Sequence, residues 1–208
     1  MRLQRLLRNL AFQDLACLAF HSYLTLRIFC APDSADAQAA RPFALGLLLA
    51  TTLVVALVRL ELMPQGLVRG IGYRLLMIAL VVLSYFELRH LLPGLQRPLL
   101  DAQMLRLDQR LFGVTPALWL DQFVRPATVE WFSFFYYSYF TLVGLHVIGS
   151  SLLDRGRRQQ EILLGTMLIT IIGHVLYTVF PGVGPHATMR FPHELQGGLF
   201  FGLVLKAD

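Results

Sequence analysis

The chain has 208 residues, of which 56% are hydrophobic and only 15% are charged, and its formal net charge is +5 at pH 7. This composition is too apolar for a soluble domain with a polar surface, and basic residues that flank apolar segments give no argument for nucleic-acid binding. We therefore predict an all-α, multi-pass integral membrane bundle that forms one domain over residues 1–208 and binds no nucleic acid.

Five apolar segments are candidates for membrane-spanning helices, because about 20 residues cross the hydrocarbon core and lipid offers no partner for open backbone groups. They cover about residues 11–30, 43–59, 71–92, 127–153 and 161–180. The first is interrupted by Asp14, His21 and Arg27. A cleaved signal peptide is the alternative for it, since small residues follow at positions 35–39, and its loss would leave four spans.

Between the third and fourth spans, residues 98–124 are too polar to cross the bilayer and too apolar for an ordinary loop. Apolar residues recur there at helical spacing, at Leu99, Leu100, Met104, Leu107, Leu111 and Phe112. This pattern predicts an amphipathic helix on the membrane surface. A break at Gly113 and Pro116 then precedes a second short interfacial piece anchored by Trp119.

Two histidines, His146 and His174, lie inside the fourth and fifth spans. Ionisable groups within a span are costly and often functional, yet we favour neutral, buried imidazoles bonded to a neighbouring helix. Small residues allow helices to approach closely. We expect such contacts at three pairs of residues, Gly46/Ala50, Gly144/Ile148 and Gly165/Ile169.

The arginines predict the orientation in the membrane, because Lys and Arg near span ends stay on the cytoplasmic side. They lie before the first span, between the second and third, and between the fourth and fifth, at Arg2, Arg5, Arg8, Arg59, Arg69, Arg155, Arg157 and Arg158. The N-terminus is then cytoplasmic. Residues 98–124 and the terminal loop 181–208 share the outer face.

No familiar catalytic motif occurs in the sequence. Gly-rich nucleotide loops, HExxH and GxSxG are missing, and neither the scattered histidines nor the two cysteines form a metal-ligand pattern. We therefore expect no metal and no cofactor, and we assign no catalytic residue. The remaining polar groups of the two outer segments are Asp101, Asp108, Arg110, Asp121, Arg125, His186, Arg190, His193, Glu194 and Lys206.

Three of these residues, Arg125, His186 and Arg190, are candidates for binding a phosphate or a lipid headgroup. Arg and His side chains bond phosphate oxygens, and these three lie in segments assigned to the outer face. The alternative for Arg125 is an interfacial arginine ahead of a span that begins with Pro126. His186 and Arg190 could equally be solvated loop residues.

Several stretches recur in an order that resembles a known family. Residues 107–120 (LDQRLFGVTPALWL) precede an aromatic span with YYSYF at 136–140, and YTVFPGVGP at 177–185 leads to FP at 191–192 and LQGG at 195–198. The pattern is similar to the membrane-bound type 2 phosphatidic acid phosphatase superfamily, in its branch related to inositol-phosphorylceramide synthases. The resemblance covers about residues 99–200. It implies an outward-facing, metal-free site where one histidine attacks phosphorus and another protonates the leaving alcohol.

The chain departs from this family at the residues that carry the chemistry. The family's Ser-x-His signature and its His followed four positions later by Asp are both missing, and its Lys seven positions before Arg-Pro is Leu118, before Arg125-Pro126. The resemblance therefore predicts the front part of a lipid phosphatase or phosphotransferase, inactive by itself, whose partners are membrane lipids and lipid phosphates. A non-enzymatic scaffold or lipid-binding subunit is the alternative, and a transporter or channel is a weaker third.

Overall fold

The computed structural model describes residues 9–63, 66, 72–95, 98–153 and 157–207. Regular structure in this part of the chain is entirely helical, without a strand. Contacts between residues divide it into two compact units. Unit 1 takes its described residues from Met1–Pro98 and Ser150–Pro181, and unit 2 from Leu99–Gly149 and Gly182–Asp208.

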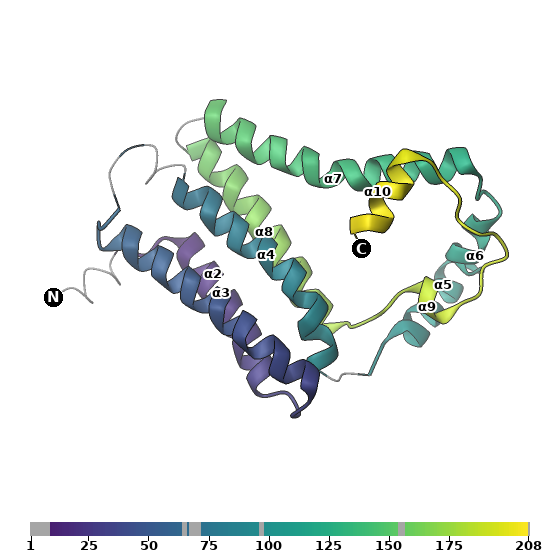
Figure 1. The fold of residues 1–208 in the computed structure, drawn as a ribbon, viewed down its shortest axis with the longest axis horizontal. Helices are drawn as coiled ribbons and strands as arrows, with labels where there is room; N and C mark the ends of the chain where they lie inside the picture. Colours follow the sequence, from purple (N-terminus) through teal and green to yellow (C-terminus); the bar gives the residue numbers. More distant parts are fainter. Residues whose placement is uncertain (1–8, 64–65, 67–71, 96–97, 154–156, 208) are drawn as a thin grey trace. The chain divides into compact units, whose positions relative to one another are not determined.

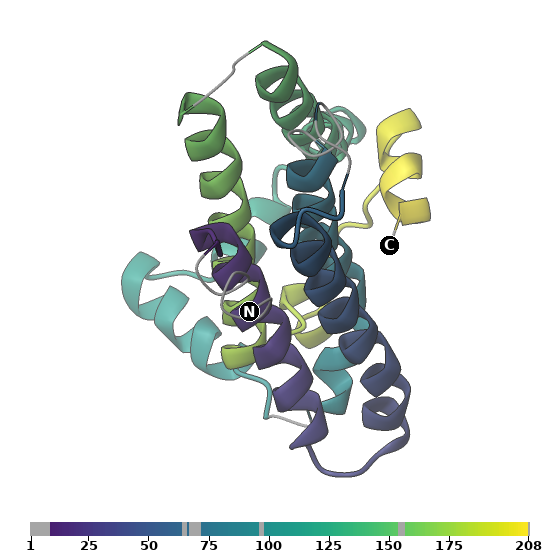
Figure 2. The ribbon, with the colours of Figure 1, turned by 90° about the vertical axis from the view of Figure 1, so that its left-hand side faces the viewer.

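Unit 1 is a bundle of four helices that lie side by side in Figures 1 and 2. They are α2 (Phe12–Phe29), α3 (Ala35–Arg59), α4 (Tyr73–Gly94) and α8 (Arg157–Val179). Helix α3 packs on α2 and α4, and α8 packs on α4 and α2, so the four helices enclose one apolar core. Helix α2 contributes residues spaced three and four apart, as one helical face requires: Cys17, Phe20, Leu24 and Ile28.

Two helices of unit 1, α3 and α8, are long and apolar enough to cross a membrane. Only 28% of the apolar window in α3 and 22% of that in α8 is buried, although the core helix of a soluble protein is mostly buried. Helices also lie at the other three predicted spans, as α2, α4 and α7 (Pro126–Leu153). In α4, the described residues Tyr73–Phe86 form an apolar helical stretch that is shorter than these two helices. Crossing of the membrane by α2, α4 and α7 stays a prediction.

The predicted close contacts at the three glycines are wrong. Their partners Ile148 and Ile169 are exposed, whereas Ala50, the partner of Gly46, packs against the core of unit 1. Apart from each helix's own backbone, no described atom lies within 4 Å of the position that a Cβ would take on any of these glycines. Larger side chains make the helix contacts instead, as where Sγ of Cys17 lies 3.2 Å from Sδ of Met167. Small residues permit a close approach but do not require one, so the position of a glycine alone does not locate an interface.

Unit 2 contains the helices that position the candidate site. They are α5 (Asp101–Phe112), α6 (Pro116–Asp121), the part of α7 up to Gly149, α9 (Pro185–Thr188) and α10 (Leu199–Ala207). Gly113 ends α5 with φ +70°, a left-handed conformation that suits glycine, and Pro116 opens α6. The two helices fall where the pattern over residues 98–124 predicts them. Their position at a membrane surface stays a prediction.

The predicted orientation rests partly on arginines that lie outside the described residues: Arg2, Arg5, Arg8, Arg69 and Arg155. Of the others, Arg59 ends α3, and Arg157 and Arg158 begin α8. The orientation and the shared outer face of residues 98–124 and 181–208 stay predictions.

Candidate functional site

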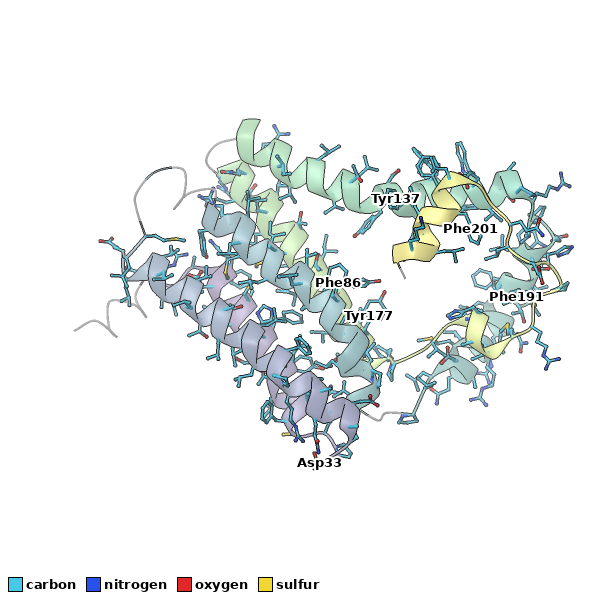
Figure 3. The ribbon with its side chains drawn as sticks, in the orientation of Figure 1. Asp33, Phe86, Tyr137, Tyr177, Phe191 and Phe201 are labelled. Carbon is cyan, nitrogen blue, oxygen red and sulfur yellow. The ribbon has the colours of Figure 1, made fainter. Side chains whose placement is uncertain are left out.

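The terminal segment of unit 2, residues 182–207, is bonded to three different helices by acidic side chains. Asp101 begins α5, Asp121 ends α6 and Glu130 lies in the second turn of α7. These three acids hold the segment in which Figure 3 labels Phe191 and Phe201. The course of this segment is therefore set by residues far earlier in the chain.

The carboxylate of Asp101 accepts two backbone N–H groups of the loop before α9. Its Oδ1 lies 2.8 Å from N of Gly184 and 3.1 Å from N of Val183. Gly184 has φ +86°, a conformation that glycine adopts without steric cost, and successive N–H groups in such a turn converge on one anion. Since Asp101 is that anion, these two N–H groups are already engaged.

Glu130 caps the start of α10 in a similar way. Its carboxylate oxygens lie 2.7 Å from N of Gly198 and N of Phe200, and 3.2 Å from N of Phe201. The first N–H groups of a helix have no partner within the helix, and its N-terminus carries a partial positive charge. Glu130 supplies both the missing acceptors and the opposite charge. The ring of Phe134 then packs edge-on against Phe200, with centroids 4.9 Å apart.

Asp121 and His193 form a pair of side chains between α6 and the terminal segment. Nδ1 of His193 lies 2.6 Å from Oδ2 of Asp121. The Asp121 side chain is 5% exposed and the His193 side chain is 56% exposed. A buried carboxylate on Nδ1 fixes the orientation of an imidazole and leaves Nε2 as the remaining ring nitrogen. In the described part of the chain, no other group bonds to Nε2.

A surface hollow of about 380 Å³ lies beside this pair. We call it the Arg125 hollow, and its lining residues are Val124, Arg125, Pro126, Pro192, His193, Glu194 and Gln196. One wall comes from the turn between α6 and α7, and the other comes from the terminal segment. The hollow thus combines a guanidinium, a carboxylate and an imidazole held by a buried acid.

The three candidate binding residues do not come together at this hollow. Arg125 lines it, whereas His186 on α9 and Arg190 in the stretch after α9 do not belong to its lining. Both of these side chains are exposed. The structure therefore does not place all three residues at this hollow, and the binding roles of Arg125, His186 and Arg190 stay predictions.

Sequence reasoning missed the pairing of His193 with Asp121. Both residues belong to the polar groups of the outer segments, but 72 positions separate them, and no motif spacing joins residues so far apart. The sequence also predicted no binding role for Glu194. The one available signal was the presence of the two segments on the same predicted side of the membrane, which indicates proximity but does not select a pair.

One end of the unit 1 bundle contains a buried ion pair. Asp14 is fully buried, with Oδ2 2.6 Å from Nε of Arg59 and Oδ1 bonded by the Tyr73 hydroxyl. Oδ2 also accepts the backbone N–H of Ala11 at 2.8 Å. Each carboxylate oxygen has partners within the protein, so we assign this cluster to the joining of α2, α3 and α4 and to no ligand.

Two histidines lie in the interior of the same bundle. Nδ1 of His174 lies 2.8 Å from Oγ of Ser84 on α4, which confirms the prediction of a bond to a neighbouring helix. Nδ1 of His21 lies 2.9 Å from Oγ1 of Thr51, while its Nε2 has no partner among the described residues. The prediction of a buried imidazole is wrong for His146, whose side chain is exposed.

The described residues hold no group of three or more His, Cys, Asp or Glu side chains that could bind a metal ion. The Arg125 hollow brings a guanidinium and an imidazole, two groups suited to an anionic ligand, into one lining. Comparison of the chain with protein-family models, with curated proteins and with solved structures finds no match in any of the three.

Proposed function

We propose that the chain is a multi-pass integral membrane protein that binds a lipid phosphoester in the Arg125 hollow, as the substrate-binding part of a histidine-type phosphatase or phosphotransferase. The observation that carries this proposal is the position of Arg125 in one hollow with His193, whose Nδ1 is held by Asp121. The chain has neither of the family's catalytic signatures. Binding of the substrate, and not its turnover, is therefore the function that we propose for these residues.

The chemistry of the lining supports a phosphate group as the ligand. A guanidinium presents a planar fork of donors that matches two phosphate oxygens and keeps its charge at any physiological pH. An imidazole whose Nδ1 donates to a carboxylate can accept at Nε2, or donate there once it is protonated. Arg125 and His193 both line the hollow and together offer donors suited to a phosphate.

The apolar surface of the chain supports a membrane location. Exposed leucines and isoleucines follow the outer faces of the two candidate spans, α3 and α8, at Leu45, Leu49, Leu53, Ile169, Ile172 and Leu176. In unit 2, α5, α6 and the turn after them expose further apolar residues, namely Leu107, Leu111, Phe112, Trp119 and Phe123. Large exposed apolar patches mark contact with a partner or a membrane. A lipid therefore fits the hollow better than a free sugar phosphate.

A lipid-binding scaffold without any enzymatic partner is the second candidate. It is favoured by the missing signatures and by the engagement of the Val183 and Gly184 N–H groups with Asp101, which removes these two amides of the Gly-rich loop from binding a phosphate. Both candidates share the same binding site. They differ in whether a phosphoester bound at Arg125 is ever cleaved.

Binding of short-chain lipids to the chain in detergent tests the proposal. Native mass spectrometry measures the affinity for dioctanoyl lipids with and without a phosphate group. Arg125→Gln is expected to weaken binding of every phosphate-bearing lipid by about tenfold or more, because charge-assisted bonds to the phosphate are lost. Arg110→Gln, at an exposed position on α5 outside the hollow, is the control and is expected to bind as the unchanged chain does. Equal affinities for the two variants would contradict the proposal.

A further inference from the structure

We infer that the Arg125 hollow selects a zwitterionic phosphodiester headgroup, with the phosphate on Arg125 and the ammonium on Glu194. This inference rests on the proposed function, since it specifies the ligand of the same site. It follows from three properties of the lining: its balance of charges, the availability of its two charged side chains and the contrast between Glu194 and the other acids of unit 2.

The lining carries one permanent positive and one negative side chain. Arg125 supplies the cation and Glu194 the anion, while Gln196 is polar and uncharged. The remaining members are apolar, except His193. A lipid with a phosphate monoester brings up to two negative charges and no cation, so it would face the Glu194 carboxylate without compensation. A headgroup with one phosphate charge and one ammonium matches both side chains.

Both charged side chains are exposed and available to a ligand. The hydrogen bonds of Arg125 involve its backbone N and O, which bond to the hydroxyl of Thr128. Among the described residues, neither the Arg125 guanidinium nor the Glu194 carboxylate forms an ion pair, with each other or with a third group. A ligand therefore has no internal salt bridge to displace when it enters the hollow.

Glu194 differs in this respect from the acids that hold the terminal segment. Asp101 and Glu130 are bonded to backbone N–H groups, and Asp121 is bonded to His193. Those three carboxylates have a structural partner that explains their position. Glu194 has none in the described part of the chain, and it lines the same hollow as Arg125. An ammonium group from the ligand is the missing partner that the charge pattern indicates.

The test compares dioctanoyl phosphatidylethanolamine, which has an ammonium, with dioctanoyl phosphatidic acid, which is a monoester without one. Native mass spectrometry of the full chain in detergent measures both affinities, with dioctanoyl phosphatidylinositol as a diester without a cation. We expect the unchanged chain to bind the ethanolamine lipid most tightly. Glu194→Gln should weaken that binding by about three- to tenfold, because one ion pair at a partly exposed site is lost. It should leave phosphatidic acid binding equal or tighter.

Asp108→Asn is the matched control, because it also turns an acid of unit 2 into its amide, but outside the hollow. It should leave the ratio of the two affinities unchanged. The inference is overturned if the unchanged chain binds phosphatidic acid or phosphatidylinositol as tightly as the ethanolamine lipid, or if Glu194→Gln leaves the ratio unchanged. If Arg125→Gln weakens all three lipids in that case, the proposed function stands without the inference. If Arg125→Gln changes none of them, both fall.

Discussion

Single residues in this protein stabilise contacts between helices through buried polar bonds. Asp14 joins α2 to Arg59 at the end of α3 and to Tyr73 at the start of α4. Its side chain is wholly buried, and that of Arg59 is 19% exposed. A charge in such a place needs its partner, because an isolated buried ion is far less favourable than a paired one.

Asp14→Asn should therefore destabilise unit 1 strongly. The substitution leaves the Arg59 guanidinium in a buried site without a counter-charge, which costs about 3 kcal/mol or more. Asp33→Asn is the control, because Asp33 pairs with Arg41 at 3.1 Å but is 68% exposed, and exposed pairs contribute less than about 1 kcal/mol. Unfolding in mixed detergent and dodecyl sulfate micelles measures both losses. Similar losses for the two variants would show that the Asp14 pair has no special role.

Elements in unit 2 depend on acids that come from other helices. The nine residues of α10 are too few for a stable isolated helix. Glu130 on α7 bonds to the N–H groups of Gly198, Phe200 and Phe201 at its start. The terminal helix is therefore defined by a side chain on α7 as much as by its own apolar sequence.

Glu130→Ala should loosen the first turn of α10. The three N–H groups lose their acceptor and the helix N-terminus loses a compensating charge, so their hydrogen exchange should become several-fold faster. Hydrogen exchange followed by mass spectrometry measures this for the peptide that contains them. Exchange of α2, which belongs to unit 1, should not change. A uniform increase along the whole chain would indicate a general loss of folding and not a missing cap.

The elements were largely predictable from the sequence, whereas the site was not. Long apolar runs place the helices, and Gly113 followed by Pro116 locates the break between α5 and α6, because these signals are local. Arg125 was a candidate because its residue type and its segment suited a phosphate. Its neighbours in the hollow, His193 and Glu194, arrive from a segment some 70 residues later, and no local pattern encodes such a meeting.

At the scale of the whole molecule, many large apolar side chains are exposed, as expected for helices that contact lipid. Leu53 is 58% exposed and lies on α3, within one of the two helices that are long and apolar enough to cross a membrane. Leu62 is 66% exposed but lies after the end of that helix. Substitutions at these two leucines therefore distinguish a side chain that faces the membrane interior from one that is merely exposed.

Leu53→Arg should impair membrane insertion of α3, since an arginine near the centre of a spanning helix costs about 2.5–3.5 kcal/mol on insertion scales. Leu62→Arg should have little effect, because an arginine beyond the helix end reaches the interface. A glycosylation-based insertion assay in microsomes measures the fraction of spanning chains for each variant. If both variants insert as the unchanged chain does, α3 does not cross the membrane.

The bond between His193 and Asp121 gives the molecule one further property. His193 lines the hollow and, through its bond to Asp121, also connects the terminal segment to α6. In the proposed complex, a headgroup would bond to Nε2 of an imidazole whose Nδ1 is already bonded to Asp121. Binding of the headgroup and attachment of the terminal segment to α6 would then be thermodynamically linked. By thermodynamic reciprocity, whatever effect the Asp121 bond has on the affinity for the headgroup, the bound headgroup has the same effect on the stability of that bond.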